Sequence, residues 1–339
     1  MRIALIIVSL WLALGLGGAC SSGSSGAAAT GDGDDTDRVG HDATGDGDDT
    51  DRVGHDATAD AQASELSDVD AIEPGPDVTP ALGSCKRGIA YGHHSLADLS
   101  ALQPAVRWWY NWAYTPDPGL VDGGYRTLGV EYAPMIWGGT FDTKTATDEI
   151  PQGAKVLLGF NEPNFGSQSN LSATEAAALW PDLEAIADAR GLLLVSPAVN
   201  YCGGDCQDTD PFHYLDEFFE ACAGCRVDRV AFHVYVGCHP SGSNKAQWLI
   251  DHVETYKQRF SQPLWLTELA CTDAKNFDEQ IAFLEDAVAY LESDPRIERY
   301  AWFSGRFQGI PFVDLLGDDG TLTPLGQAYV SAPSPSCKP

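Results

Sequence analysis

Two glutamates stand at the ends of apolar stretches of the sequence. An ionisable side chain is unusual next to a buried segment, so each of these glutamates is a candidate for a functional role. Glu162 lies in VLLGFNEPNF (156–165), and Glu268 lies in PLWLTELA (263–270). Apolar runs of this length are typical of strands buried on both faces, as in a parallel sheet. Pro163 ends the first strand because it has no N–H for the ladder. Each glutamate is therefore predicted at the carboxyl end of a buried strand.

Two carboxylates that face each other can cleave glycosidic bonds. In a retaining glycosidase they stand about 5–5.5 Å apart; one attacks the anomeric carbon, and the other protonates the leaving oxygen and later activates water. Aromatic rings suit the apolar faces of sugars, and amides suit their hydroxyls. Such residues occupy neighbouring strand ends, and the candidate substrate-binding residues are Asn111, Trp137, Asn161, His233, Tyr235 and Trp302.

The elements that must position these residues are eight predicted strands, several of them separated by helical patterns. Alternation of strand and helix indicates a parallel sheet, and eight strands in about 250 residues indicate a closed α/β fold, the (β/α)8 TIM barrel. The active site of this fold lies at the carboxyl ends of the strands, so Glu162 on the fourth and Glu268 on the seventh would face each other. The predicted strands are residues 86–92, 106–113, 130–138, 155–162, 192–200, 229–236, 263–270 and 299–305.

Helical patterns fill several of the links. A capping box of Ser172 and Glu175 opens one helix, and Pro181 inside it is expected to kink or restart it. Residues 245–260 and 278–293 place apolar side chains at three- and four-residue spacing. The link between the second and third strands contains prolines and glycines and gives the weakest helical signal.

Each candidate also has a purely structural interpretation. A lone strand-end glutamate can pair with an arginine, and His233 can be a hydrogen-bonded core histidine. Tryptophans can fill the core, and alternation along the strands predicts Trp109 and Trp265 beneath the helices. The chemical interpretation is favoured because two glutamates, one of them preceded by Asn161, occupy strand ends together.

The strings at the strand ends resemble those of glycoside hydrolase family 128. RWWYNWA, YAPMIWG, LLGFNEPN, VSPAV, FHVYV, WLTELA and RYAWF occur in this order, and the resemblance covers residues 86 to about 330. The family lies within the retaining (β/α)8 glycosidases and consists chiefly of endo-β-1,3-glucanases. The resemblance implies a β-1,3-glucan of the laminarin or curdlan type as substrate, cleaved by double displacement.

The same resemblance implies individual roles. Glu162 would be the general acid/base and Glu268 the nucleophile. Asn161 would bond the 2-hydroxyl of the sugar next to the cleaved linkage, Tyr235 would lie near the nucleophile, and Trp302 would form the floor of the glycone site. The loop YCGGDC after the fifth strand departs from the family's shared core, and we expect it on the active-site face. Further substrate contacts would come from Asn111, Trp137 and His233.

The first twenty residues predict export. A short basic start precedes an apolar stretch that is too short to span a bilayer comfortably, and small residues lead into Cys20. This ending resembles the lipobox of bacterial lipoproteins, although Gly17 stands where leucine is usual; an ordinary secretory signal is the alternative. We expect residues 1–20 to be a signal peptide, with Cys20 lipid-anchored at the bacterial cell surface or outer membrane, or the protein otherwise secreted.

Residues 21–84 predict a disordered, acidic tether that leads into a barrel domain at 85–339. They carry sixteen Asp and Glu against two Arg, and ATGDGDDTDRVGH at 29–41 returns at 43–55. The segment lacks aromatic residues, so it cannot bury enough surface to offset chain entropy. A calcium-binding loop is the alternative, but the residue pattern of such loops is not met. The net charge of −29 argues against nucleic acid as a partner, because phosphate binding needs clustered Lys and Arg.

Eight cysteines follow Cys20, an even number for a compartment in which disulfides persist. A bridge between Cys85 and Cys337 would tie the ends of the barrel domain together. Cys222 and Cys225 favour a structural disulfide over a redox or zinc pair, because no second pair of this spacing accompanies them. Sequence alone leaves the connectivity open.

Other functions stay open at this level. One is a non-catalytic β-glucan-binding surface lipoprotein built on the same barrel, and another is a retaining hydrolase of a different β-glycan. The presence of both glutamates favours an enzyme, since binding alone needs no nucleophile. His93 and His94 have no further ligand at a suitable spacing, so no metal and no cofactor is predicted. We expect a monomer, and endo or exo action is not decided.

Overall fold

The computed structural model describes residues 82–337. The predictions for the signal peptide, for Cys20 and for most of the acidic tether concern residues 1–81 and lie outside this range. Among the described helices, none combines the length and the apolar character needed to cross a membrane.

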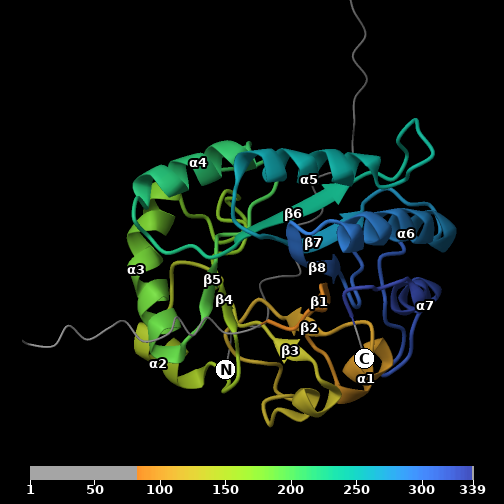
Figure 1. Ribbon diagram of the computed structural model, residues 1–339, viewed down its shortest axis with the longest axis horizontal. Coiled ribbons are helices and arrows are strands. Elements are labelled where there is room, and N and C mark those ends of the chain that lie inside the picture. Colours follow the sequence, from red (N-terminus) through yellow and green to blue (C-terminus); the bar gives the residue numbers. More distant parts are fainter. Residues whose placement is uncertain (1–81, 338–339) are drawn as a thin grey trace, which may run out of the picture. The chain divides into compact units, whose positions relative to one another are not determined.

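The described residues form eight strands at the positions that the sequence predicts. Helices separate most of the strands along the chain (Figure 1). The strands are β1 (Arg87–Ala90), β2 (Trp108–Tyr110), β3 (Glu131–Tyr132), β4 (Val156–Leu158), β5 (Leu193–Val195), β6 (Val230–Val236), β7 (Leu264–Cys271) and β8 (Ile297–Phe303).

The strands close into a ring of parallel pairs. One sheet has the order β3-β2-β1-β8-β7-β6, and β4 pairs with β5. Single bridges join these two parts: Met135 with Leu158 links the segment after β3 to β4, and Val199 with Phe232 links the segment after β5 to β6. The predicted α/β barrel with a parallel central sheet is confirmed.

The helices cover the outside of the strands (Figure 1). The capping box of Ser172 and Glu175 opens α3 as predicted. Of the two effects expected of Pro181, a kink or a restart, the restart does not occur, because the helix continues through this residue. The weak link between β2 and β3 contains a short 3-10 helix, η1 (Gly124–Leu128). The α-helices are α1 (Leu96–Leu102), α2 (Thr143–Glu149), α3 (Ala173–Arg190), α4 (Pro211–Ala221), α5 (Gln247–Arg259), α6 (Phe277–Ser293) and α7 (Pro324–Ser331).

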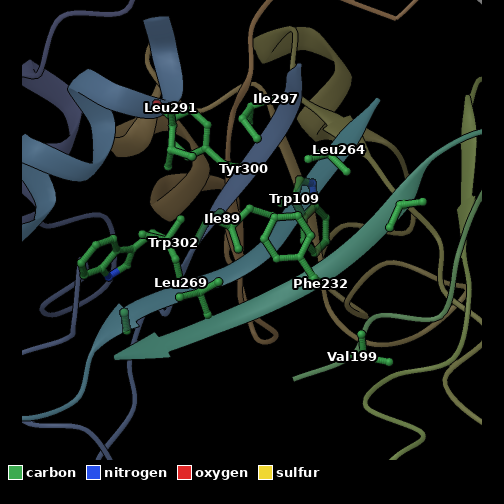
Figure 2. Packing of buried hydrophobic residues seen from close by; sticks show 14 of the residues in the cluster. Ile89, Trp109, Val199, Phe232, Leu264, Leu269, Leu291, Ile297, Tyr300 and Trp302 are labelled. Atoms are coloured by element: carbon green, nitrogen blue, oxygen red, sulfur yellow. The ribbon is translucent and has the colours of Figure 1, made fainter. Parts of the chain in front are cut away.

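Two apolar clusters hold the barrel together. The larger lies between strands and helices and includes Ile89, Trp109 and Phe232, which Figure 2 shows from close by. The smaller fills the barrel interior and includes Trp108 and Trp265. Alternate residues of one strand belong to different clusters, because successive side chains of a strand point to opposite faces.

The amino-terminal end of the interior is filled by two indoles and a group of charges. The Arg299 guanidinium lies 5.5 Å from the ring centre of Trp108 and 5.0 Å from that of Trp265. Arg299 also pairs with Glu131, which accepts a hydrogen bond of 2.7 Å from Lys155. Because this end is packed with side chains, the site can open only at the carboxyl ends of the strands.

A bulge in β7 changes which side chains face the interior. In the pairing of β6 with β7, Phe232 lies opposite Leu266 and the next residue of β6 lies opposite Glu268, so Thr267 is extra. A bulge of this kind reverses the alternation of side chains beyond it. Trp265 and Glu268, three residues apart, consequently both face inward, and the prediction of Trp265 beneath the helices is wrong.

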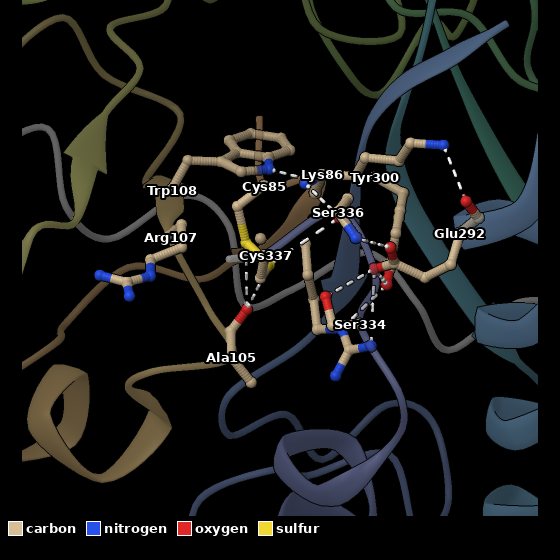
Figure 3. Close-up of a disulfide and its surroundings, with 12 residues drawn as sticks. Cys85, Lys86, Ala105, Arg107, Trp108, Glu292, Tyr300, Ser334, Ser336 and Cys337 are labelled. Carbon is tan, nitrogen blue, oxygen red and sulfur yellow. Dashed lines mark hydrogen bonds and ion pairs between the residues drawn. A yellow bond between two sulfur atoms is a disulfide. The ribbon is translucent and has the colours of Figure 1, made fainter. Parts of the chain in front are cut away.

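The two ends of the described chain meet at the amino-terminal end of the barrel. Cys85 and Cys337 form the predicted disulfide, and both sulfur atoms face the carbonyl of Ala105 (Figure 3). Next to the bridge, Lys86 donates to three carbonyl groups at the end of α6, the shortest of these bonds being 2.7 Å to Asp294. The other disulfides are Cys202–Cys206, Cys222–Cys225 and Cys238–Cys271, so the predicted bridge between Cys222 and Cys225 is also confirmed.

Gly88 tests the packing of the barrel interior. A Cβ at this position would lie 2.3 Å from the indole of Trp108, which cannot move without displacing Arg299. Gly88→Ala should lower the free energy of unfolding by about 1–3 kcal/mol, as measured by urea denaturation. Gly119→Ala is the matched control, because no atom lies within 4 Å of its added Cβ. Equal stability of the two variants would contradict this account of the interior.

Candidate active site

Glu162 stands at a sharp turn of the backbone beyond the end of β4. Its φ of 39° lies in the left-handed region, which residues other than glycine seldom adopt. The N–H of Asn161 donates to the carbonyl of Trp137 at 2.9 Å, and the N–H of Glu162 donates to the carbonyl of Ala198 at 2.8 Å. Bonds to the neighbours on both sides fix the direction of the Glu162 side chain. Backbone strain of this kind is concentrated at functional sites.

Glu268 is held by hydrogen-bond donors from two strands, β2 with the segment that follows it, and β6. Tyr110 and Trp112 each donate to Oε1 at 2.8 Å. The hydroxyl of Tyr235 donates to Oε2, and Nδ1 of His233 lies 3.3 Å from the same oxygen. Such a set of donors orients the carboxylate and stabilises its ionised form.

The two glutamates meet at one imidazole. Nδ1 of His233 lies 2.9 Å from Oε1 of Glu162, and the carboxylate oxygens of Glu162 and Glu268 come within 4.8 Å of each other. All three side chains are buried, with 5% or less of each residue exposed. The pair predicted from the strand ends is therefore assembled, at a separation suited to a shared reaction centre.

Burial dominates the electrostatics of the pair. It raises the pKa of Glu268; the positive charge of His233 opposes this rise, and the negative charge of Glu162 adds to it. Burial also raises the pKa of the hydroxyls of Tyr110 and Tyr235 well above the usual value, with the charge of Glu268 as the next cause. Both hydroxyls keep their hydrogens at neutral pH and act as donors to Glu268.

The same cluster has the donor atoms of a metal site, since one atom each of Glu162, His233 and Glu268 lies within 4.8 Å of the others. The hydrogens of Tyr110 and Trp112 already point at Oε1 of Glu268. These hydrogens favour a negative charge there and leave less room for a cation. The surroundings of Glu268 are those of a free carboxylate.

Several predicted substrate-binding residues do lie around the pair. Asn161 is buried, its amide nitrogen donates to Gln168 at 3.3 Å, and its Oδ1 has no partner among the described residues. Tyr235 bonds Glu268, and Trp137 packs, half-buried, against the interior cluster. An unpaired buried oxygen such as Oδ1 of Asn161 is an acceptor available to a substrate hydroxyl.

Two predicted residues lie elsewhere. Trp302 is fully buried on the helix side of β8, where its ring packs near Phe283 and Tyr329 and its Nε1 donates to the carbonyl of Val313 at 2.9 Å. The prediction of Trp302 as the floor of the site is wrong, because Trp302 belongs to the cluster between strands and helices (Figure 2), whereas its neighbour Ala301 belongs to the interior cluster.

Asn111 is engaged by its own loop and by Tyr132 of β3. Its amide nitrogen donates to Asp117 and to the carbonyl of Thr115, both at 3.1 Å, and its Oδ1 accepts from Tyr132 at 2.6 Å. The structure does not bring it to the carboxylates, since alternation along β2 directs Tyr110 inward and Asn111 outward.

Four residues of the site were not predicted. Tyr110 and Trp112 flank the chosen Asn111, and the strand parity of Trp108 in the interior could have identified them. Asn200 ends the predicted fifth strand and donates to Oε1 of Glu162 at 3.4 Å. Phe303 follows Trp302, and its half-buried ring lies 5.9 Å from that of Trp112 and 5.5 Å from that of Tyr235.

The loop YCGGDC lies beside the segment that follows Glu162, as expected. Cys206 pairs with Phe165 in an antiparallel bridge, and the N–H of Gly166 donates to the carbonyl of Asp205 at 2.8 Å. The disulfide between Cys202 and Cys206 closes the loop on itself. The acid-bearing turn is thus supported from the β5 side by a covalently closed loop.

Comparison with known proteins agrees with this site. Residues 88–329 match the family described as glycosyl hydrolase catalytic core. A family 128 subgroup II endo-β-1,3-glucanase from Sorangium cellulosum is 64% identical; the match covers 74% of this chain and 100% of that chain, with a TM-score of 0.73. This chain belongs to glycoside hydrolase family 128. It is a glycoside hydrolase, as the strand-end strings implied.

Two more distant relatives also match this chain. A subgroup I endo-β-1,3-glucanase from Amycolatopsis mediterranei, solved in complex with laminaritriose, is 31% identical with a TM-score of 0.60; the match covers 74% of this chain and 100% of that chain. Alkali-sensitive linkage protein 1 of Schizosaccharomyces pombe is 25% identical over 263 residues, which are 73% of this chain. The match spans only 45% of the length of that curated relative.

The raised pKa of Glu268 predicts a pH-dependent stability. A carboxyl group whose pKa is higher in the folded than in the unfolded protein stabilises the fold below the unfolded value of about 4.3, and this contribution is lost as pH rises through the folded value. Glu268→Gln stays neutral, so its Tm should exceed that of the wild type at pH 7 and approach it near pH 4. Thermal unfolding followed by circular dichroism between pH 4 and 8 measures this.

Glu220→Gln, an exposed position at the end of α4, is the control for a surface charge. It should leave the Tm nearly unchanged at every pH. A Tm difference between Glu268→Gln and the wild type that does not vary with pH would refute the assignment of Glu268 as the destabilising buried charge.

Proposed function

We propose that this chain is an endo-β-1,3-glucanase that cleaves with retention of anomeric configuration. The observation that carries the mechanism is the approach of the Glu162 and Glu268 carboxylate oxygens to within 4.8 Å. Retaining enzymes hold their carboxyl groups about 5–5.5 Å apart, whereas inverting enzymes leave about 6.5–9.5 Å for a water molecule. The shorter separation favours direct attack by a carboxylate.

The environment of each glutamate suggests its role. Glu268 receives hydrogen bonds from Tyr110, Trp112 and Tyr235, which stabilise a negative charge and suit a nucleophile. Glu162 has fewer donors, Nδ1 of His233 at 2.9 Å and Asn200 at 3.4 Å, which suits the general acid/base. Glu268 would attack the anomeric carbon while Glu162 protonates the leaving oxygen.

The substrate assignment is supported by the relatives. The Sorangium cellulosum protein is an endo-β-1,3-glucanase and is 64% identical over its whole length, and the Amycolatopsis mediterranei enzyme was crystallised with laminaritriose. Trp112 donates to Glu268 and its ring packs near that of Phe303, and Trp137 is half-buried against the interior cluster; such rings can stack on glucose rings. Asn161 supplies an unpaired acceptor for a hydroxyl.

Hydrolysis of laminarin and curdlan by the full chain tests the proposal. The wild type should release a ladder of oligosaccharides, and proton NMR should show the β-anomer as the first product. Glu268→Gln and Glu162→Gln should each lower kcat by more than about a thousandfold. Glu220→Gln serves as the surface control and should retain full activity.

Each other outcome identifies a different function. Binding of these glucans without cleavage would support the non-catalytic glucan-binding alternative. Release of the α-anomer first would overturn the retaining mechanism, and release of a single short product from chain ends would overturn endo action. If the protein is inactive on β-1,3-glucans but cleaves another β-glycan, the substrate assignment is wrong and the proposed mechanism still holds.

We also propose that the protein is exported and lipid-anchored through Cys20. Four disulfides join the eight cysteines of the described residues, which is typical of proteins from oxidising compartments. In a bacterial host, the full chain should enter the membrane fraction, and Cys20→Ala should release it in soluble form. Recovery of both forms in the same fraction would contradict a lipid anchor at this residue.

A further inference from the structure

His233 contacts both carboxylates with the same nitrogen. Its Nδ1 lies 2.9 Å from Oε1 of Glu162 and 3.3 Å from Oε2 of Glu268. The residue is 1% exposed, and its Nε2 is buried without a partner among the described residues. The imidazole therefore lies beneath the pair, where the predicted role of His233 as a substrate contact does not fit its surroundings.

The hydrogen of the imidazole can be assigned from these contacts. Both atoms that face Nδ1 are carboxylate oxygens, of Glu162 and Glu268, and an ionised carboxylate only accepts hydrogen bonds. Since one of the two glutamates is ionised at every stage of a retaining reaction, Nδ1 carries a hydrogen. The N–H at Nδ1 of His233 is thus shared between the two oxygens.

The negative charge changes place during the reaction, provided that the proposed retaining mechanism holds. In the first step an oxygen of Glu268 forms a bond to the anomeric carbon, the glycosidic C–O bond breaks, and the proton of Glu162 passes to the leaving oxygen. In the second step a water oxygen bonds to the anomeric carbon, its proton passes to Glu162, and the ester electron pair returns to Glu268. The charge is on Glu268 at rest and on Glu162 in the glycosyl-enzyme.

We propose that the Nδ1–H of His233 is a positioning group that stabilises the charge on Glu268 before the first step and on Glu162 after it. Both oxygens are within reach of the same hydrogen, so the change of acceptor requires no movement of the imidazole. A donor fixed in advance for both states lowers the reorganisation that the charge shift would otherwise require.

The fold holds this donor rigidly. His233 belongs to β6, and the bulge in β7 places Glu268 directly opposite it. The titratable groups that face the imidazole are Glu162 beyond β4 and Glu268 on β7, with Tyr235 edge-on at 6.5 Å. Tyr110 of β2 bonds the far oxygen of Glu268. The imidazole has carboxylates on its polar edge and keeps its position whichever of them is charged.

The test compares His233→Leu with His233→Asn. Leucine occupies similar space without a donor, whereas the amide of asparagine can place an N–H near the position of Nδ1. The wild-type full chain and both variants are assayed for kcat/KM against pH on laminarin and on 2,4-dinitrophenyl β-laminaribioside, whose leaving group needs no proton. Circular dichroism confirms that each variant is folded.

Loss of the donor beside Glu268 raises the pH needed to ionise this carboxyl group. His233→Leu should therefore shift the acidic limb of the kcat/KM profile to higher pH on both substrates and lower kcat by about a hundredfold. His233→Asn should keep the acidic limb near that of the wild type and recover part of the rate. A loss of rate in His233→Leu with an unshifted limb would assign a packing role only and overturn the proposal, as would equal shifts in both variants.

A measurement on the wild type covers the case in which the variants do not fold. In protein labelled with nitrogen-15 at histidine, the Nδ1–H resonance of His233 should persist in the free enzyme and in the glycosyl-enzyme trapped with a 2-deoxy-2-fluoro laminaribiosyl substrate. Its disappearance in either state overturns the shared donor. Failure of the wild type to cleave glucan or to retain configuration would instead overturn the proposed function, so the two failures are distinguishable.

Discussion

Two carboxyl groups in one buried place are the constraint on which the rest of this structure depends. Glu162 and Glu268 come within 4.8 Å of each other while both are 5% exposed or less. Burial disfavours any charge in this place, and two charges there would also repel each other. The donors that face Glu268, the imidazole of His233 and the left-handed backbone of Glu162 all act at this point. The barrel supplies the rigid strands that keep these groups at their distances.

The opposite end of the barrel explains why the site can be rigid. Arg299 lies against Trp108 and Trp265 and pairs with Glu131, which makes the interior a packed layer beneath the reaction centre. Gly88 leaves the space into which the indole of Trp108 fits. The strand ends therefore project from a filled core, and their side chains cannot sink inward when substrate is absent.

The eight strands, the two glutamates and Asn161 can be predicted from the sequence, because apolar runs and the residues that end them are local features. The sequence does not reveal which face a side chain takes beyond an irregularity. The bulge at Thr267 turns both Trp265 and Glu268 inward. On β8, by contrast, Trp302 faces the helices and Phe303 lies beside the site. Local patterns determine the strand, but pairing with the neighbouring strand determines the direction.

The same limit applies to the loops. Asn111 has the amide of a sugar-binding residue, yet this amide is taken up by Asp117 of its own loop and by Tyr132 of the neighbouring strand β3. Asn200 reaches Glu162 only because β5 lies beside β4. The carboxylate pair could be predicted because each glutamate is a charged residue that follows an apolar run. The polar groups around the pair follow no such local pattern.

The disulfide between Cys85 and Cys337 joins the two ends of the barrel domain covalently. Their Cα atoms are 4.2 Å apart, at the end of the strands that lies away from the carboxylates. A domain whose two ends coincide can be spliced as a cassette into a surface turn of another protein, or permuted so that new ends open elsewhere. In either arrangement the joint at Cys85 and Cys337 would lie away from the carboxylates.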